Sequence, residues 1–212
     1  MKLLLPFFSF LALLIGVQSA GSAESSEQPP AELLSGTAGQ AIASEVPTEH
    51  LAENFSDADV FRLRTFAEPL VADSRVASEE ERAAFLKAIN DYLSDKGSER
   101  LEEFLRDWPE SRWAAALEHN LGLLRYRDGF FTAAMSYWQN AWGRAKDSED
   151  PLLRALANQS LAELARMQAR LGRIEELKPL LQGVNRREAG GSARQMLEAS
   201  AEALHRMENN PS

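Results

Sequence analysis

The 212-residue sequence contains no cysteine, no excess of basic residues and no long apolar run after its first residues. Without cysteine the chain has no disulfide framework, no thiol nucleophile and no cysteine-ligated zinc site. The 23 Lys and Arg residues stand against 32 Asp and Glu, and the net charge of −9 is the opposite of what nucleic-acid binding requires. The apolar fraction of 44% is enough for a buried core. The sequence therefore predicts a folded protein that does not bind nucleic acid.

β-Branched residues are also scarce from residue 78 onward, where only Ile89, Thr132, Ile174 and Val184 occur. Leu and Ala dominate instead, and because they favour helices over strands, the composition predicts an all-α fold. Apolar residues recur every three to four positions, which indicates about seven helices in antiparallel pairs. The predicted helix boundaries lie at Ser78, Gly97-Ser98, Ser111, Asp128-Gly129, Asp150-Pro151, Gly172 and Gly190-Gly191-Ser192.

The first 23 residues have the three parts of a cleavable export signal. Lys2 supplies the positive start, the apolar run covers residues 3–17, and small residues follow up to Ala23. A run of 15 residues is shorter than the roughly 20 that a membrane-spanning helix needs. We therefore expect residues 1–23 to be a signal peptide, and the remaining chain to be periplasmic or extracellular without a membrane span.

The acidic residues are concentrated in one segment. Residues 24–60 hold eight acidic residues and neither Lys nor Arg, so they carry −8 of the net charge, and they are rich in Ser, Gly, Pro and Ala. Such a composition buries too little apolar surface to offset the entropy of ordering it. We interpret residues 24–77 as a largely disordered acidic linker and residues 78–212 as the helical domain. A short docking motif around residues 60–63 is the alternative.

Two hairpins of the helical domain share a sequence pattern. The first has Leu-Gly in its first helix, a turn glycine and then Ala-x3-Trp, and the second follows the same scheme. The residues are Asn120-Leu121-Gly122, Asp128-Gly129, Ala134, Trp138 and Ala141 in the first, and Glu163-Leu164-Ala165, Gly172, Leu177 and Leu181 in the second. Small residues at these positions let two helices approach closely, with Trp138 between them. Both Trp138 and Phe131 are expected in the core.

This pattern resembles the tetratricopeptide repeat (TPR). The resemblance implies helical hairpins stacked as a superhelix, with the first helix of each repeat lining a concave groove. The turn glycines lie 43 residues apart instead of about 34, and Glu118 and Arg125 stand where the family has Trp and Tyr. An ordinary helical bundle is the alternative fold.

Catalytic signals are weak. The three histidines, His50, His119 and His205, lie far apart, and no metalloprotease, nucleophile-elbow or phosphate-loop motif occurs. Paired acidic residues stand at helix starts, where they favour the positive end of the helix dipole. We therefore expect a protein that is not an enzyme and has no catalytic site, cofactor or metal.

The TPR resemblance instead implies a protein or peptide partner. The residues that it places in the groove are His119, Leu123, Tyr126, Arg127, Gln159, Arg166 and Arg170. Three arginines there would suit a carboxylate-bearing partner, since guanidinium groups bind carboxylates bidentately. The alternatives are that these arginines are ordinary solvated surface, or that the acidic tail itself covers the groove.

A second resemblance concerns residues 104–124, from Phe104-Leu105 through Trp108-Pro109 to Asn120-Leu121-Gly122. They look similar to helical-repeat regions near the N-terminus of large exported bacterial proteins of the RHS type. This implies an alternative function, as an accessory or shortened relative of a secreted hydrolytic or toxin-like system with its catalytic part on another chain. Self-association through the last helix, between Met196 and Met207, is a third expectation, because an unpaired repeat end exposes apolar surface.

Overall fold

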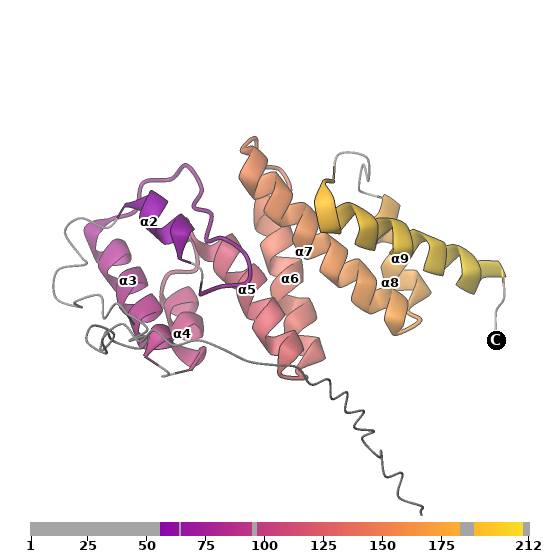
Figure 1. Ribbon diagram of the computed structural model, residues 1–212, viewed down its shortest axis with the longest axis horizontal. Helices are drawn as coiled ribbons and strands as arrows, with labels where there is room; N and C mark the ends of the chain where they lie inside the picture. Colours follow the sequence, from indigo (N-terminus) through magenta and orange to yellow (C-terminus); the bar gives the residue numbers. More distant parts are fainter. Residues whose placement is uncertain (1–55, 64, 95–96, 183–188, 210–212) are drawn as a thin grey trace, which may run out of the picture. The chain divides into compact units, whose positions relative to one another are not determined.

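The computed structural model describes residues 56–63, 65–94, 97–182 and 189–209, and every regular element in these ranges is a helix (Figure 1). The predicted signal peptide and residues 24–55 of the predicted linker lie outside the described residues. The eight helices are α2 (Asp57–Arg62), α3 (Glu79–Leu93), α4 (Glu99–Asp107), α5 (Ala114–Arg127), α6 (Phe131–Ala145), α7 (Pro151–Arg170), α8 (Ile174–Gln182) and α9 (Gly191–Asn209). The all-α prediction is confirmed, and the helix beyond the predicted seven is α2.

Local sequence signals set the helix ends. The Ser78 hydroxyl accepts a hydrogen bond from the Glu81 amide at the start of α3, and the Asp150 carboxylate accepts two at the start of α7, directly before Pro151. The turns after α5 and α7 contain Gly129 and Gly172, whose φ angles of +85° and +68° favour glycine. The predicted breaks therefore coincide with the ends of these helices.

Helices pack antiparallel against neighbours in the chain, and α5 and α6 share the most extensive contact. Gly122 makes this contact possible, because a Cβ atom at that position would lie 2.4 Å from Nε1 of Trp138. Trp138, Ala134 and Ala141 are all fully buried on α6. The predicted arrangement of small residues around Trp138 is confirmed. Phe131, also expected in the core, is 47% exposed, because it opens α6 at the turn where few neighbours cover it.

Helices α5, α7 and α9 lie side by side and run in the same direction. Hydrogen bonds between α5 and α7 join His119 to Ser160 and Tyr126 to Arg170, with sequence offsets of 41 and 44 residues. Gln159 of α7 contacts Ser192 of α9 with an offset of 33, and Arg170 and Ala203, also 33 apart, line one groove. Similar offsets at both ends of a helix pair mean that its members are parallel, so these three helices form one face.

The boundary predicted at residue 78 is wrong for the part of the linker that the structure describes. Val60, Phe66, Leu70 and Val71 are buried in the main hydrophobic core together with α3, α5 and the first half of α7. We call residues 65–73 the resident segment. Its apolar residues follow no regular period and stand next to a strongly acidic stretch, so composition hid their burial.

Polar contacts attach the resident segment to α5 and to the loop before it. The Asn120 side chain accepts a hydrogen bond from the Glu68 amide and donates one to the Glu68 carbonyl, each at 3.0 Å. At the end of the segment, the Asp73 amide donates to the Arg112 carbonyl, and the Arg112 guanidinium donates back to the Asp73 carbonyl at 2.7 Å.

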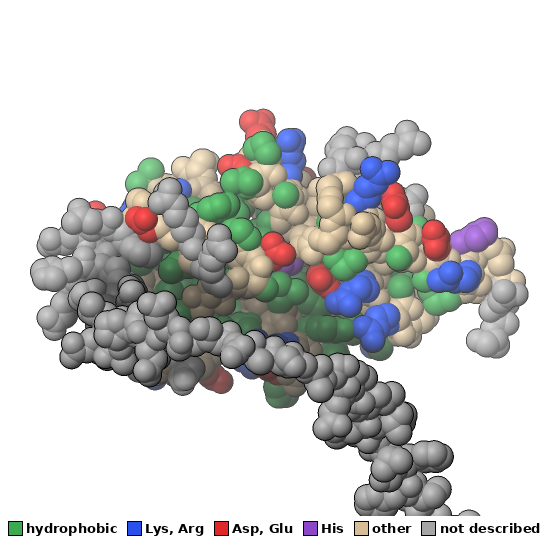
Figure 2. All heavy atoms as spheres, in the orientation of Figure 1, with side chains coloured by type: hydrophobic (Ala, Val, Ile, Leu, Met, Phe, Trp, Pro, Cys, Tyr) green, Lys and Arg blue, Asp and Glu red, His purple; other side chains and the backbone are tan. Residues whose placement is uncertain are grey.

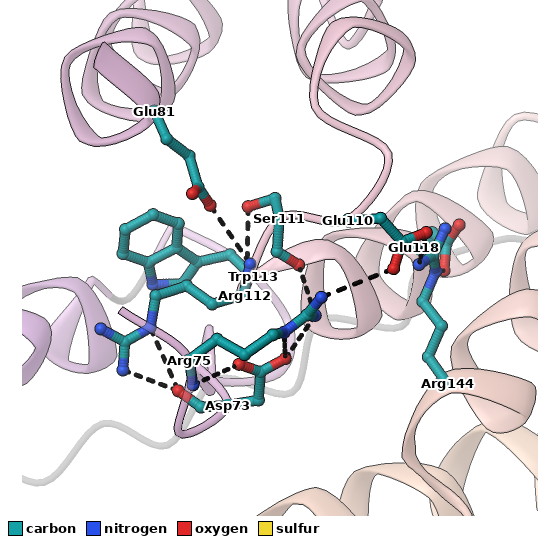
Figure 3. A network of polar contacts seen from close by, with 9 residues as sticks. All are labelled: Asp73, Arg75, Glu81, Glu110, Ser111, Arg112, Trp113, Glu118 and Arg144. Atoms are coloured by element: carbon teal, nitrogen blue, oxygen red, sulfur yellow. Dashed lines mark hydrogen bonds and ion pairs between the residues drawn. The ribbon is translucent and has the colours of Figure 1, made fainter. Parts of the chain in front are cut away.

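Figure 3 shows how this network continues. Arg75 contacts the Asp73 carboxylate at 2.5 Å and Glu110 at 3.5 Å, and Arg144 of α6 joins Glu110 to the buried Glu118. A stretch of the chain without regular secondary structure is therefore held on the helical body by both its backbone and its side chains.

Candidate partner-binding site

A groove of about 360 Å³ runs between the C-terminal half of α7 and the middle of α9. Its walls are mostly small or apolar, and two arginines of α7 stand at its edge. The lining residues are Arg166, Ala169, Arg170, Gln195, Met196, Ala199, Ser200 and Ala203. In Figure 2, basic side chains gather beside α9 over the C-terminal half of α7. The groove therefore combines apolar walls with a cationic edge.

The two arginines differ in their partners. Arg166 donates to the Glu163 carboxylate, with Nε 3.0 Å from Oε2, and its guanidinium lies 5.0 Å from the centre of the Tyr126 ring. Arg170 donates from Nη1 to the Tyr126 hydroxyl at 2.6 Å, and no carboxylate of the described residues pairs with it. Arg170 is thus the cation most available to an incoming carboxylate.

Tyr126 joins α5 to the edge of this groove. Its ring packs at a tilt against Trp138, with 5.8 Å between the ring centres, and against Phe131 at 5.5 Å. Its hydroxyl accepts a hydrogen bond from Arg170, and the Arg166 guanidinium makes a cation–π contact with the face of its ring. The structure therefore brings together three of the predicted residues, Tyr126, Arg166 and Arg170.

Gln159, a fourth predicted residue, lies at the other end of the α7–α9 pair, in a cleft of about 300 Å³. The Ser192 hydroxyl donates to its Oε1 atom at 3.1 Å. The cleft lies between α2, the resident segment, α7 and the start of α9. Its walls include Phe61, Glu68, Pro69, Val71, Leu152, Leu156, Asn158 and Ala193.

His119 does not line a groove, and its predicted role is wrong. The side chain is fully buried, its Nδ1 atom lies 2.8 Å from the Ser160 hydroxyl, and burial lowers its pKa to about 4. The Ser160 hydroxyl itself donates to the Leu156 carbonyl, so it accepts from Nδ1–H, and Nε2 has no hydrogen-bond partner. Ser160 is fully buried too. This Ser–His pair is therefore a contact between α5 and α7 that solvent does not reach.

Two further predicted residues lie apart from the α7–α9 groove. Leu123 is partly buried against the cluster that contains Trp138 and Leu164. Arg127 is exposed, lies 3.6 Å from the Asp128 carboxylate and lines a separate depression of about 440 Å³ near Tyr92 and Gly97. The predicted cluster of three arginines is thus reduced to Arg166 and Arg170.

The spacing of residues in the sequence does not reveal that α9 and the resident segment line the groove and the cleft. Met196, Ala199 and Ala203 recur at helical spacing and therefore share one side of α9. The spacing does not say which other helix this side packs beside. The role of Asn120 was not predictable from the sequence either. Its side-chain amide is buried and binds the backbone of a residue 52 positions away, and no nearby residues indicate such a contact. Of the predicted self-association surface, Met196, Leu204 and Met207 are partly buried against α7 and α8, and self-association stays a prediction.

No helix among the described residues is long and apolar enough to span a bilayer. In the same ranges, no three His, Asp or Glu side chains are grouped so that they could share a metal ion. Comparison of the chain with protein-family models, with curated proteins and with solved structures finds no match.

Proposed function

We propose that this chain is an exported, non-enzymatic helical-repeat protein of TPR-like architecture that binds a carboxylate-bearing segment of another protein. The binding site is the groove between α7 and α9, on the face that these helices form with α5. The observation that carries the proposal is Arg170, a cation without a carboxylate partner in the described ranges, beside apolar walls. Bidentate hydrogen bonds to a carboxylate at such an edge give both affinity and orientation.

Two features support the TPR-like architecture. Helices α5, α7 and α9 are parallel neighbours, and α5 and α7 are each followed by an antiparallel helix, as a stack of hairpins requires. The resident segment also lies on the α5 part of this face, where Asn120 binds its backbone. The face thus already holds an irregular segment of this chain, and the α7–α9 groove is the part left open.

The export assignment rests on the signal pattern of residues 1–23, which places the partner in a bacterial envelope or outside the cell. The non-enzymatic assignment rests on the sequence, which has no catalytic motif, and on the burial of the Ser–His pair. No cofactor is part of the proposal.

The proposal is tested by affinity capture with the full chain carrying a C-terminal tag, from an envelope extract of the organism that makes it. Arg170→Glu is compared with Arg127→Glu. Because the turn glycines are 43 residues apart, Arg127 occupies the position in the first hairpin that Arg170 occupies in the second. Both are exposed, so neither change disturbs the core.

We expect the unchanged chain and Arg127→Glu to capture the same protein, and Arg170→Glu to capture about tenfold less of it, which corresponds to about 1.4 kcal/mol. Equal capture by all three chains, with unchanged helical circular dichroism, contradicts the assigned site.

A further inference from the structure

The groove at Arg170 and the cleft at Gln159 lie along the same seam between α7 and α9. On α7, Gln159 and Arg166 are seven residues apart and therefore project from the same side of the helix. The residue offset between the two helices is 33 at both ends, from Gln159 with Ser192 to Arg170 with Ala203. We call this continuous line the α7–α9 seam. From Gln159 to Arg170 it spans eleven residues, or about 16 Å at 1.5 Å per residue.

The two ends of the seam carry opposite unpaired charges. At the cleft, no described side chain forms a hydrogen bond or an ion pair with the Glu68 carboxylate. Of Glu68, the Asn120 side chain is hydrogen-bonded only to the backbone. Burial, with the nearby Glu163 carboxylate, raises the pKa of Glu68 above its usual value, so an added cation there would be stabilising. At the groove, Arg170 has only the Tyr126 hydroxyl.

Apolar surface lies beside both charges. Phe61 and Leu152, at the edge of the cleft, are 43% and 52% exposed, and Met196, Ala199 and Ala203 line the groove. Each cavity alone is about 300 to 360 Å³, which a small molecule would fill without touching the other end. The placement of both charges along one seam points instead to a ligand long enough to reach both.

We propose that the α7–α9 seam binds a peptide segment of a partner protein that carries a cation at one end and a carboxylate at the other, with apolar residues between them. The cation contacts Glu68 and the carboxylate contacts Arg170. From Gln159, which lines the cleft together with Glu68, to Arg170 the seam spans about 16 Å, which corresponds to about five residues of an extended segment or about eleven of a helix. This inference rests on the proposed function and adds the charge pattern and the orientation of the bound segment, which the two ends fix.

The experiment is a selection of random 16-residue peptides displayed on phage against the immobilised full chain. Parallel selections use Glu68→Gln and Arg170→Gln, with Glu176→Gln and Arg127→Gln as controls. Glu176 and Arg127 are exposed and lie outside the seam. Glu68→Gln keeps the size of the side chain and the backbone contacts with Asn120, so this variant is expected to fold.

Selected peptides are expected to carry a basic and an acidic residue about five or eleven positions apart, with apolar residues between. Glu68→Gln should remove only the preference for the basic residue, and Arg170→Gln only the preference for the acidic one. Synthetic forms of the best peptides should bind each seam variant about tenfold more weakly, and the control variants unchanged.

Peptides without this pairing of charges, or selection that is the same on the seam variants, would overturn the inference, as would no enrichment at all. Capture of a protein from the envelope extract in an Arg170-dependent manner tests the proposed function separately, and it can succeed when the charge pairing fails.

Discussion

The two halves of the face formed by α5, α7 and α9 differ in what lies on them. On α5 and the first half of α7, the resident segment covers the helices, with Leu70 and Val71 in the core and the Asn120 amide on the Glu68 backbone. Between α7 and α9 the face is a groove with Arg170 at its edge. The same kind of surface is therefore part of the core in one half and an open groove in the other.

The two hairpins behind this face differ by compensating changes of size. With the 43-residue offset, Gly122 corresponds to Ala165 and Trp138 to Leu181. In the first hairpin the largest side chain lies over a glycine, and in the second a leucine and an alanine share one buried cluster. Likewise Asn120, which binds a backbone, corresponds to Glu163, which binds Arg166. The two hairpins thus differ both in the size of the side chains that pack between their helices and in the partners of their buried polar residues.

The largest effect is expected for Leu70→Ala, which tests whether the resident segment belongs to the core. Leu70 is 1% exposed, so its truncation leaves a cavity and should lower the free energy of unfolding by about 3–5 kcal/mol. Met196→Ala in the open half removes a partly buried side chain and should cost about 1 kcal/mol. Urea titration followed by circular dichroism measures both. Similar decreases in the free energy of unfolding for both variants would mean that Leu70 and Met196 are equally well packed, which would contradict the difference between the two halves.

Gly122→Ala tests the contact that distinguishes the first hairpin. The new methyl group meets the buried Trp138 ring, and we expect a loss of about 3 kcal/mol in the free energy of unfolding. Gly143→Ala is the control, because a Cβ there meets nothing within 4 Å, and it should stabilise the helix by about 0.5–1 kcal/mol.

Combining Gly122→Ala with Trp138→Leu reproduces the residue pair of the second hairpin and should cost less than the sum of the single changes. Strict additivity in the unfolding titration would show that Gly122 and Trp138 do not depend on each other.

The His119–Ser160 contact between the halves should make stability depend on pH. His119 has a pKa of about 4 in the folded chain against 6.5 unfolded, so between these values the unfolded chain binds more protons. The free energy of unfolding should therefore fall by about 2 kcal/mol from pH 7.5 to pH 5. Burial raises the pKa of Glu68 and Glu118, which acts in the opposite direction.

The His119 contribution is isolated by comparing the unchanged chain with His119→Leu at both pH values. In His119→Leu, the free energy of unfolding should no longer fall between pH 7.5 and pH 5. Only the opposite contribution of the Glu68 and Glu118 carboxyl groups should remain. If both chains respond equally to pH, then His119 is not the group responsible.

Apart from the control variants, the smallest effect is expected for Asn120→Ala, which removes the two hydrogen bonds to Glu68 and should cost about 1–2 kcal/mol. Asn158 lines the open cleft and has no hydrogen-bond partner among the described side chains, so Asn158→Ala should change the unfolding free energy by less than about 0.5 kcal/mol. Hydrogen exchange of the residue 65–73 amides, faster in Asn120→Ala only, would show that the amide holds the resident segment.

Local signals made much of the helical part predictable. The caps at Ser78 and Asp150 and the positive-φ glycines Gly129 and Gly172 act within a few residues, so the sequence sufficed to place the ends of these helices. The Gly122–Trp138 pair was predictable for a similar reason, since two helices joined by a tight turn must face each other. Tyr126, Arg166 and Arg170 were predicted together from the repeat resemblance, and in the structure both arginines contact Tyr126.

By itself, then, the sequence determined that the described chain is helical, where most of its helices begin and end, and which side of α7 carries arginines. Only the tertiary structure decided that His119 is buried, that Arg127 stands apart from Arg170, and that residues 65–73 lie on α5. Those outcomes depend on contacts between residues about 40 to 50 positions apart, and helical periodicity says which residues share a side but not which neighbour covers that side. Packing the resident segment on α5 filled one half of the face, and the position of α9 left the other half open.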